Sequence, residues 1–554
     1  MKEIEIQLKT GPREQPVERT VEHGTTLEKL AKEYGNLPYT VLAAKVDNKT
    51  SELTKRIEKP CAIEFLDMRD QGGNLIYQRS LSLVYLKAVH DVMGKVSVTI
   101  ENSLNKGLYT EIKTPDPVTE EEVRQIEQRM REIVDSDIPF VREEMNREDA
   151  LKVLLEDGLM EKEKMLRKSE VEKVPFYSLE GFRNFFYGLM TPSTGYVKLF
   201  ELRKYRRGVL LRFPHPSAPD RIPPYVDEVL LYQAFGEAKN WDRIMKISYV
   251  DDLNETIESG EYKEVIQISE ALHEKKIAQI ADMITEQKRR IVLISGPSSS
   301  GKTTFARRLN IQLRVNGLEP LYLGTDDYFV ERSQTPKDEN GEPNFEDLEA
   351  LDIDLFNRDM NGLLNGEEVD IPAFDFLHGT KVFGKRITRA KKGQPIIIEG
   401  IHGLNRQLTQ EIPDGEKFKI YISPLTQLNI DKHNRIPTTD ARMLRRMVRD
   451  YQFRGHSAQS TIRSWPKVRQ GEDKNIFPFN GQADVFFNSE HIYELAVLKK
   501  YAEPLMRSIT RQEPEYSEAV RMLKFLQYFK AIEDDSIIVN NSIIREFIGG
   551  SIFV

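Results

Sequence analysis

Hydrophobic positions along this chain follow two different periods. From residue 291 onward, short runs of branched aliphatic residues alternate with stretches in which apolar residues recur every three to four positions. The runs predict strands and the stretches predict helices. Strands are expected at 291–295, 321–325, 395–400, 418–423 and 484–489, and helices at 302–316, 352–364, 438–453 and 490–509. Such an alternation is typical of a doubly wound parallel α/β sheet.

The first 66 residues show a different pattern, in which strand-like alternation surrounds one short amphipathic segment. Strands are expected at 4–8, 17–21, as a pair within 41–53 and at 61–67, with a helix within 23–35 that a threonine caps and Gly35 ends. A small α+β module is therefore predicted. A long helical stretch over 261–290 connects the two halves of the chain, after a proline-rich turn or linker at 214–224.

Length and composition narrow the class of protein. A chain of 554 residues suggests about three domains. The net charge is −8, with 80 basic and 88 acidic side chains, so any nucleic-acid contact would need a local basic patch. Cys61 is the one cysteine, no window has about 20 apolar residues, and the N-terminus lacks a signal-peptide core. We expect a cytoplasmic protein with no membrane segment.

One segment carries a motif with specific chemistry. Residues 296–303, GPSSSGKT, match G-x-x-x-x-G-K-[ST] between a predicted strand and a predicted helix. The amides of such a loop and the positive end of the helix bind phosphate, so we expect Lys302 to reach the β- and γ-phosphates of ATP and Thr303 to bind Mg²⁺. The alternative is a chance match, which the flanking strand and helix disfavour. The predicted ATP-binding residues are Gly296, Pro297, Ser298, Ser299, Ser300, Gly301, Lys302, Thr303 and Thr304.

Two carboxylates follow other strands of the predicted sheet. Asp326 comes directly after the strand at 321–325, and Glu399 ends the strand at 395–400. Because ligands of parallel sheets bind at the carboxyl ends of the strands, we expect both beside the phosphate loop. Phosphoryl transfer needs a carboxylate that orients the attacking hydroxyl and oxygen ligands for Mg²⁺. The alternative for Asp326, and for its neighbour Asp327, is helix N-capping.

A row of arginines marks the predicted helix at 438–453. Arg442, Arg446 and Arg449 are spaced four and three residues apart, so they share one helical face, and Arg454 follows. Such a row repels itself unless anions lie opposite. ATP phosphates would be such anions, and a helix that closes over them would stabilise the transferring charge. The alternative is a solvated face paired to acids such as Asp440 and Asp450.

Residues 291–510 resemble the uridine kinase/phosphoribulokinase family of P-loop kinases. GPSSSGKTT, TDDYF, NFEDLEALD, IPAFDFLHGT and IIIEGIH carry the resemblance. It implies that Asp326 accepts the proton of a nucleoside 5′-hydroxyl, that Glu399 is the carboxylate on the Mg²⁺ side, and that lid arginines assist catalysis. The catalytic set implied is Asp326, Lys302, Arg446, Arg449 and Arg454. The substrate-binding set is Asp326, Tyr328, Phe345, Glu346, Phe374 and His378.

The chain departs from this family at substrate or lid positions. Glu346 replaces an aspartate, Phe374 replaces a tyrosine, and His456 stands where another arginine is usual. Loss of a tyrosine hydroxyl that binds a base could redirect base choice, since an unpaired polar group costs roughly 1–3 kcal/mol. The departures thus leave uridine as the leading expectation for the acceptor only because of the family resemblance. The tract 464–489 has no role that the residues themselves indicate.

The N-terminal half resembles threonyl-tRNA synthetases. GTTLEKLAKEY and AAKVDNKTSEL are similar to the TGS domain, a ubiquitin-like module with a binding or regulatory role. Residues 118–158 and 190–202 resemble the editing domain of these synthetases. The four positions that bind metal in that editing domain hold Arg79, Leu83, Phe186 and Met190 in this chain. None of these is a hard zinc ligand, so no hydrolytic site is expected here. The basic-aromatic run 203–213 would contact RNA or nucleotide, or form a solvated strand face.

The sequence thus predicts a multidomain α/β protein with a TGS-like module at 1–66, an editing-like α+β domain at 67–255 and a P-loop kinase domain at 261–554. The predicted function is an Mg²⁺- and ATP-dependent nucleoside kinase. Two alternatives stay open, which are a kinase for a sugar phosphate or other small alcohol, and an RNA- or ribosome-associated protein that uses ATP as a switch. RNA or a regulatory nucleotide is a further partner to test at the N-terminal half. The oligomeric state is open.

Overall fold

The computed structural model describes residues 3–554 except 12–13, 170, 339–340 and 427. Its N-terminal module is a five-stranded mixed sheet in the order β2-β1-β5-β3-β4 with one helix packed against it. The elements are β1 (Glu3–Lys9), β2 (Val17–Glu22), α1 (Leu27–Tyr34), β3 (Ala43–Val46), β4 (Lys49–Ser51) and β5 (Cys61–Leu66). The Thr26 hydroxyl accepts from the Lys29 amide at 3.2 Å, so Thr26 is the predicted threonine cap of α1. The predicted α+β pattern of strands and helix is confirmed.

The second region contains two antiparallel sheets, in the orders β10-β9-β8 and β11-β12-β7-β6, with helices packed on them. Its elements are α2 (Gln71–Met93), β6 (Ser97–Leu104), β7 (Gly107–Lys113), α3 (Glu120–Asp135), β8 (Val141–Asn146), α4 (Arg147–Glu156), α5 (Met160–Lys168), β9 (Lys173–Leu179), β10 (Phe182–Phe185), β11 (Glu201–Tyr205) and β12 (Gly208–Arg212). One face of α3 is apolar and packs into this region, where Val123, Ile126, Met130 and Ile133 are all buried.

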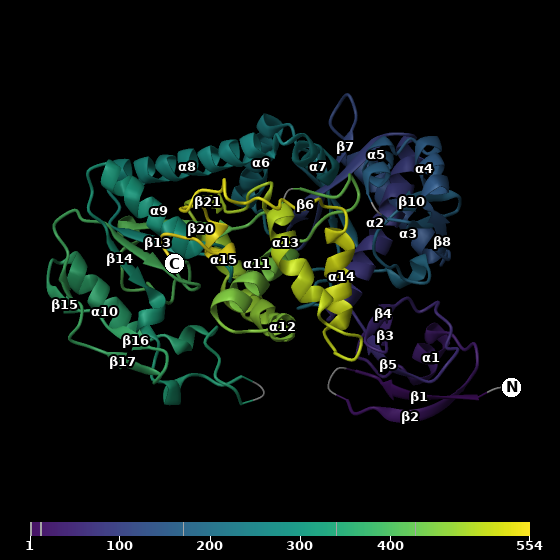
Figure 1. Cartoon of the computed structure of the whole chain (residues 1–554), viewed down its shortest axis with the longest axis horizontal. Coiled ribbons are helices and arrows are strands. Elements are labelled where there is room, and N and C mark those ends of the chain that lie inside the picture. Colours follow the sequence, from purple (N-terminus) through teal and green to yellow (C-terminus); the bar gives the residue numbers. More distant parts are fainter. Residues whose placement is uncertain (1–2, 12–13, 170, 339–340, 427) are drawn as a thin grey trace.

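Three helices connect this region to the C-terminal half. They are α6 (Val229–Met245), α7 (Val250–Ser259) and α8 (Tyr262–Gln287), and α8 runs along one edge of the molecule in Figure 1. The halves are not separated by solvent. One buried apolar cluster includes Phe176 and Phe185 from the second region together with Leu444 and Phe525 from the C-terminal half. The two halves therefore share part of their hydrophobic core.

The C-terminal half contains a five-stranded sheet in the order β14-β19-β13-β20-β21, and every pair is parallel. Its strands are β13 (Ile291–Ser295), β14 (Leu321–Gly324), β19 (Ile396–Glu399), β20 (Lys417–Ser423) and β21 (Val485–Asn488). Successive side chains of β13 point to opposite faces, so Val292 and Ile294 join one core and Ile291 and Leu293 join another. The predicted doubly wound sheet is confirmed.

Helices cover both faces of this sheet. On one face, α8 and α9 (Lys302–Val315) pack with Ile543 and Phe547 from the C-terminal segment, whereas α10 (Ile353–Leu364) covers the other. The remaining elements are β15 (Glu368–Asp370), β16 (Ala373–Asp375), β17 (Thr380–Val382), β18 (Ile387–Arg389), α11 (Thr438–Phe453), α12 (Ala458–Asn475), α13 (Glu494–Arg507), α14 (Tyr516–Leu526) and α15 (Arg545–Ile548). Figure 1 shows the C-terminus returning to the side of β13. None of the helices described is long and apolar enough to cross a membrane.

Candidate active site

The loop between β13 and α9 has the conformation that its glycines permit. Gly301 has φ +82° and Ser299 has φ +59°, both in the left-handed region. A Cβ on Gly296 would lie 1.9 Å from the carbonyl oxygen of Ile422, and one on Gly301 would lie 2.5 Å from Ile543. Gly296 is therefore required by the neighbouring backbone of Ile422, and Gly301 by the turn and by the contact with Ile543. The loop leads directly into the N-terminus of α9, where the first amides of the helix and the helix dipole favour an anion.

Lys302 and Thr303 begin α9 at the end of this loop. The Lys302 ammonium donates to the carbonyl oxygens of Gly296 at 3.0 Å and Pro297 at 3.1 Å, and burial lowers its pKa. The Thr303 hydroxyl donates to the Glu399 carboxylate at 3.0 Å, and burial raises the pKa of that carboxyl. Parallel pairing places Glu399 opposite Ile294, one strand away. The structure thus brings together the two predicted metal-binding residues.

Asp326 lies in a short turn, Thr325–Tyr328, that follows β14. Its carboxylate accepts no hydrogen bond from any residue that the structure describes, and the turn begins at Gly324 without a side-chain cap, so helix capping does not explain Asp326. The carboxylate is open to solvent, yet the surrounding protein raises its pKa by desolvation, an effect that Lys302 opposes. Asp326 therefore combines proximity to Lys302 with a free carboxylate.

Asp327 has a different role. Its carboxylate pairs with Arg386 at 2.9 Å and accepts from the amide of Phe374 at 3.4 Å. It thus ties the turn after β14 to the hairpin of β16 and β17. This explains why two adjacent aspartates differ in their hydrogen bonding.

The predicted substrate-binding residues do not all lie on one surface. Phe345 and Phe374 both pack edge-on against Phe329, with ring centroids 5.4 and 5.6 Å away, and so form an apolar wall after Asp326. Tyr328, in contrast, is fully buried and its hydroxyl donates to Asp359 of α10 at 3.3 Å. Its side chain therefore belongs to the core below the turn.

Glu346 and His378, the other two predicted substrate-binding residues, lie in different surroundings. Burial raises the pKa of Glu346, and the charge of Glu472 adds to this effect. The charges of Arg446 and Lys302 oppose it, which indicates that Glu346 lies near the phosphate loop. His378 is exposed on the hairpin and pairs with Asp375 at 2.7 Å. Among the described contacts, nothing joins His378 to the aromatic wall.

The arginines of α11 fall into two groups. Arg442 and Arg445 are fully buried and hold the phosphate loop from behind, since they donate to the carbonyl oxygens of Ser298 at 3.1 Å and Ser299 at 3.3 Å. Arg442 pairs with Glu472 of α12, and Arg445 pairs with Glu494 of α13. The predicted grouping of Arg442 with the lid arginines is therefore wrong, because packing against α12 buries this residue.

Arg446, Arg449 and Arg454 form the second group, which we call the arginine cluster. All three contact Asp450, at 3.4, 2.8 and 3.6 Å respectively, so the pairing with Asp450 that the sequence left open is present. Arg446 also donates to the Ser298 hydroxyl at 2.9 Å. Three cations share one acid, which leaves positive charge beside the phosphate loop. Asp440 pairs instead with Arg521 of α14 at 2.6 Å.

Two acids at this site were not found from the sequence. Glu472 accepts from the amide of Ser298 at 3.1 Å, which gives the tract 464–489 one role, that of positioning the phosphate loop. Glu546 of α15 accepts from the amide of Thr304 at 3.3 Å and from its hydroxyl at 2.8 Å. Both acids lie far along the chain from the loop and in no recognisable motif, so no local signal identifies them.

The basic-aromatic run at 203–213 forms the hairpin of β11 and β12. Its arginines are mostly engaged within the protein: Arg212 pairs with Glu201, and the guanidinium of Arg203 lies 3.8 Å from the ring centroid of Tyr225. Arg206 lies 3.5 Å from Asp227. The strand-face interpretation fits these contacts better than an RNA-binding surface.

Known proteins similar to this chain fall into two groups, one for each half. The sequence model of the Phosphoribulokinase / Uridine kinase family matches residues 291–495. A uridine kinase of Staphylococcus aureus (strain JH9) is 31% identical over 197 residues, which are 35% of this chain and 85% of that protein. A uridine kinase of Ligilactobacillus salivarius (strain UCC118) is 29% identical over 201 residues, which are 36% of this chain and 85% of that protein.

The N-terminal half is similar to threonine–tRNA ligases. The ligase of Symbiobacterium thermophilum is 32% identical over 186 residues, or 33% of this chain. Those residues cover 29% of the ligase, so the chain spans less than a third of that relative's length.

Proposed function

The chain belongs, through residues 291–495, to the phosphoribulokinase/uridine kinase family, and on this premise we propose that it transfers the γ-phosphate of ATP to the 5′-hydroxyl of a nucleoside. The observation that carries the proposal is the free carboxylate of Asp326 beside Lys302, at the edge of the sheet where the phosphate loop also lies. A carboxylate without a structural partner is suited to accept the proton of an attacking hydroxyl.

The other residues have complementary roles in this proposal. The loop amides and the N-terminus of α9 would hold the phosphates, and Lys302 would leave the carbonyl oxygens of Gly296 and Pro297 to bind them. The arginine cluster would offset the charge that spreads over the transferring group. Arg446 is the best placed of the three, because it already donates to the Ser298 side chain.

The residues present fit a magnesium ion. Thr303 and Glu399 supply hard oxygen donors that are already 3.0 Å apart, and Mg²⁺ commonly takes only one or two protein ligands beside phosphate and water oxygens. Thr303 and Glu399 would hold the ion, whose charge helps to neutralise the phosphates.

The wall of Phe329, Phe345 and Phe374 favours a nucleoside as the acceptor, since an aromatic face can stack on a base. One observation favours the second candidate, a sugar phosphate or other small alcohol: His378, which the family resemblance would place near the base, is exposed and bound to Asp375. We further propose a cytoplasmic location, a TGS-like module at 1–66 and an editing-like domain at 67–255 with a regulatory or binding role.

A transfer assay tests the proposal. The full chain is incubated with Mg·ATP and a panel of ribonucleosides, deoxyribonucleosides and sugar phosphates, with Lys302→Ala as the blank and Lys288→Ala as a matched control outside the loop. We expect turnover on one or two nucleosides that is lost in the blank. Turnover on a sugar phosphate alone would support the second candidate. ATP binding without transfer to any acceptor would contradict both kinase proposals and support the ATP switch.

A further inference from the structure

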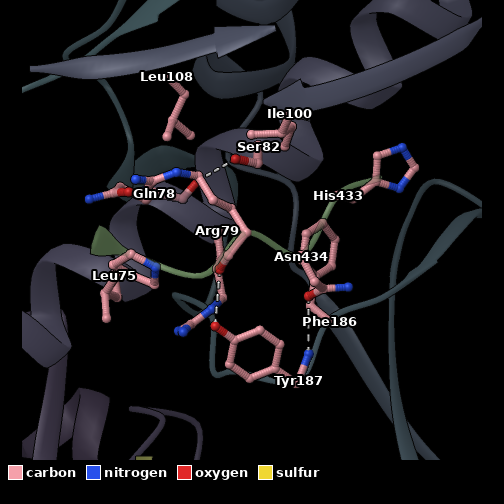
Figure 2. Close-up of a pocket in the computed structure, with 12 residues that line it drawn as sticks. Leu75, Gln78, Arg79, Ser82, Ile100, Leu108, Phe186, Tyr187, His433 and Asn434 are labelled. Atoms are coloured by element: carbon pink, nitrogen blue, oxygen red, sulfur yellow. Dashed lines mark hydrogen bonds between the residues drawn. The ribbon is translucent and has the colours of Figure 1, made fainter. Parts of the chain in front are cut away.

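A cavity lies away from the phosphate loop, where α2 and the 186–187 segment meet the loop that leads into α11. Its volume is about 40 Å³, on the order of three times the space that one water needs. Figure 2 shows Arg79, Tyr187 and Asn434 converging on it from these three segments. Its lining residues are Leu75, Gln78, Arg79, Ser82, Ile100, Leu108, Phe186, Tyr187, His433, Asn434, Arg435 and Pro437.

Two arginines, Arg79 and Arg435, line this cavity. Within the part of the chain that the structure describes, neither has a carboxylate partner. Arg79 lies against the ring of Tyr187, with its Cζ 5.2 Å from the centroid. The Nε of Arg435 is buried without a hydrogen-bond partner, and burial lowers the pKa of this arginine to about 10, an effect that the charge of Asp440 opposes. Partly buried cations that form no direct ion pair are costly.

The acids near this cavity are already engaged. Asp440 accepts hydrogen bonds from the two terminal guanidinium nitrogens of Arg521, at 2.6 and 2.7 Å. Asp431 pairs with the buried Lys162 at 3.3 Å. Glu52 accepts from the Met190 amide at 3.1 Å and also from a tyrosine hydroxyl. Asp440 still acts on Arg435 at longer range, but none of these three acids forms an ion pair with Arg79 or Arg435 among the described residues.

His433 does not add a third charge. Its Nδ1 lies 3.1 Å from the side-chain amide of Asn184, which donates to it, and its Nε2 lies 3.2 Å from the carbonyl oxygen of Val98. Burial lowers the pKa of His433 well below its usual value, so the ring is neutral. On the other side of Arg79, burial and then the charges of Arg79, Lys49 and Arg142 lower the pKa of Lys524 to about 8. The surroundings of Arg79 are thus strongly positive.

The backbone is shaped around Arg79. A Cβ on Gly188 would lie 2.0 Å from the Cζ of Arg79 and 2.3 Å from its Nε, so a larger residue at this position would displace the guanidinium. The Tyr187 hydroxyl donates to the carbonyl oxygen of Arg435 at 3.2 Å, and the Tyr187 amide donates to Asn434 at 3.4 Å. Tyr187, against whose ring Arg79 lies, is thus joined to the segment that carries Arg435.

We propose that this cavity binds a phosphate group between Arg79 and Arg435. Two guanidiniums present planar sets of donors that suit a tetrahedral oxyanion, and the volume fits one such group. The ligand is inorganic phosphate or a phosphomonoester whose organic part lies outside the cavity. Because Arg435 precedes α11 by three residues, the bound anion would connect the second region to the helix that carries Arg446. This site is separate from the proposed kinase reaction and does not depend on it.

Equilibrium dialysis of ³²P-labelled orthophosphate against the full chain tests the proposal. All proteins carry Lys302→Ala, which weakens phosphate binding at the loop. Arg79→Gln and Arg435→Gln each remove one guanidinium, and Gly188→Ala displaces Arg79 without changing the charge. Arg124→Gln is the matched control, because Arg124 lies exposed on α3 and pairs with Glu121. Melting temperatures confirm that each variant is folded.

We expect submillimolar phosphate binding that falls at least tenfold in Arg79→Gln, Arg435→Gln and Gly188→Ala and is unchanged in Arg124→Gln. Glycerol phosphate that displaces the label at lower concentration than phosphate would identify a phosphomonoester ligand, and the reverse order would identify free phosphate. Binding that none of the three variants weakens would overturn the proposal, as would binding weaker than millimolar. Binding of a short single-stranded RNA that depends on both arginines, with no competition by either small anion, would also overturn it.

Discussion

Glu546 accepts a hydrogen bond from the amide of Thr304, which is one of the groups that can bind phosphate in such a loop. The carboxylate accepts from the Thr304 amide at 3.3 Å and from the hydroxyl at 2.8 Å, and both residues are buried. Bound phosphate would need the same amide at the N-terminus of α9. We therefore predict that Glu546→Gln, which keeps the shape of the side chain and removes its charge, strengthens ATP binding.

The size of the effect follows from these two bonds. A hydrogen bond to a charged group contributes about 1.5–3 kcal/mol, and the longer of the two bonds will contribute less. Glutamine retains part of the interaction, so we expect the competing contact to weaken by about 1–2 kcal/mol. Since 1.4 kcal/mol corresponds to a tenfold change in affinity, the Kd of ATP should fall by roughly 5- to 30-fold.

Isothermal titration of ATP into the full chain measures this change, beside Glu533→Gln as a control from an exposed part of the same C-terminal segment. Unfolding is followed in parallel, because Glu546 also contributes to packing beside Ile543. An unchanged or raised Kd in a folded Glu546→Gln protein would refute the reasoning, since the carboxylate would then support the loop and not compete with phosphate.

Three further predictions concern the site and the stability of the chain. Asp326→Asn should lower kcat by about 10²- to 10⁴-fold with ATP affinity retained, as measured by steady-state kinetics and titration, because it removes only the proton acceptor. Arg442→Met should lower the free energy of unfolding by about 3 kcal/mol in urea, since it leaves Glu472 buried without its main partner. The pKa of Asp242 is raised to about 8 by burial and by Glu101, so its folded form binds a proton more tightly than its unfolded form. The contribution of Asp242 to the free energy of unfolding should therefore fall as the pH rises from 4 to 8, by at most about 1.4 kcal/mol per pH unit. Asp242→Asn should remove this part of the pH dependence.

Each of these has a matched control. Asp327→Asn should affect the hairpin more than the proton transfer, so equal losses of kcat in both aspartate variants would contradict the role of Asp326. The double variant Arg442→Met/Glu472→Leu should regain most of the stability but not the ATP affinity, and recovery of both would show that the pair does not position the loop. A pH slope that Asp242→Asn and the exposed Asp116→Asn change equally would contradict the assignment to Asp242.

Much of the fold could be predicted because its signals are local. The runs at 291–295 and 418–423 are mostly apolar, as expected of strands covered on both faces, and they are neighbours in the parallel sheet. The loop at 296–303 needs its glycines at fixed positions for the turn, so a short motif is enough to identify it. Asp326 and Glu399 follow from the rule that parallel strands present their carboxyl ends at one edge.

The sequence by itself therefore determined the strands, the helices and the residues of short motifs, since these depend on neighbours within a few positions. Only the tertiary structure decided which arginines of α11 face the site: the helical period places Arg442 and Arg446 on one side, but packing against α12 buries the first and leaves the second beside Ser298. The tertiary structure alone also brought Glu546 to Thr304 and Arg79 to Arg435. Such pairs are separated by hundreds of residues, and their contact follows from how whole elements pack, which no local pattern records.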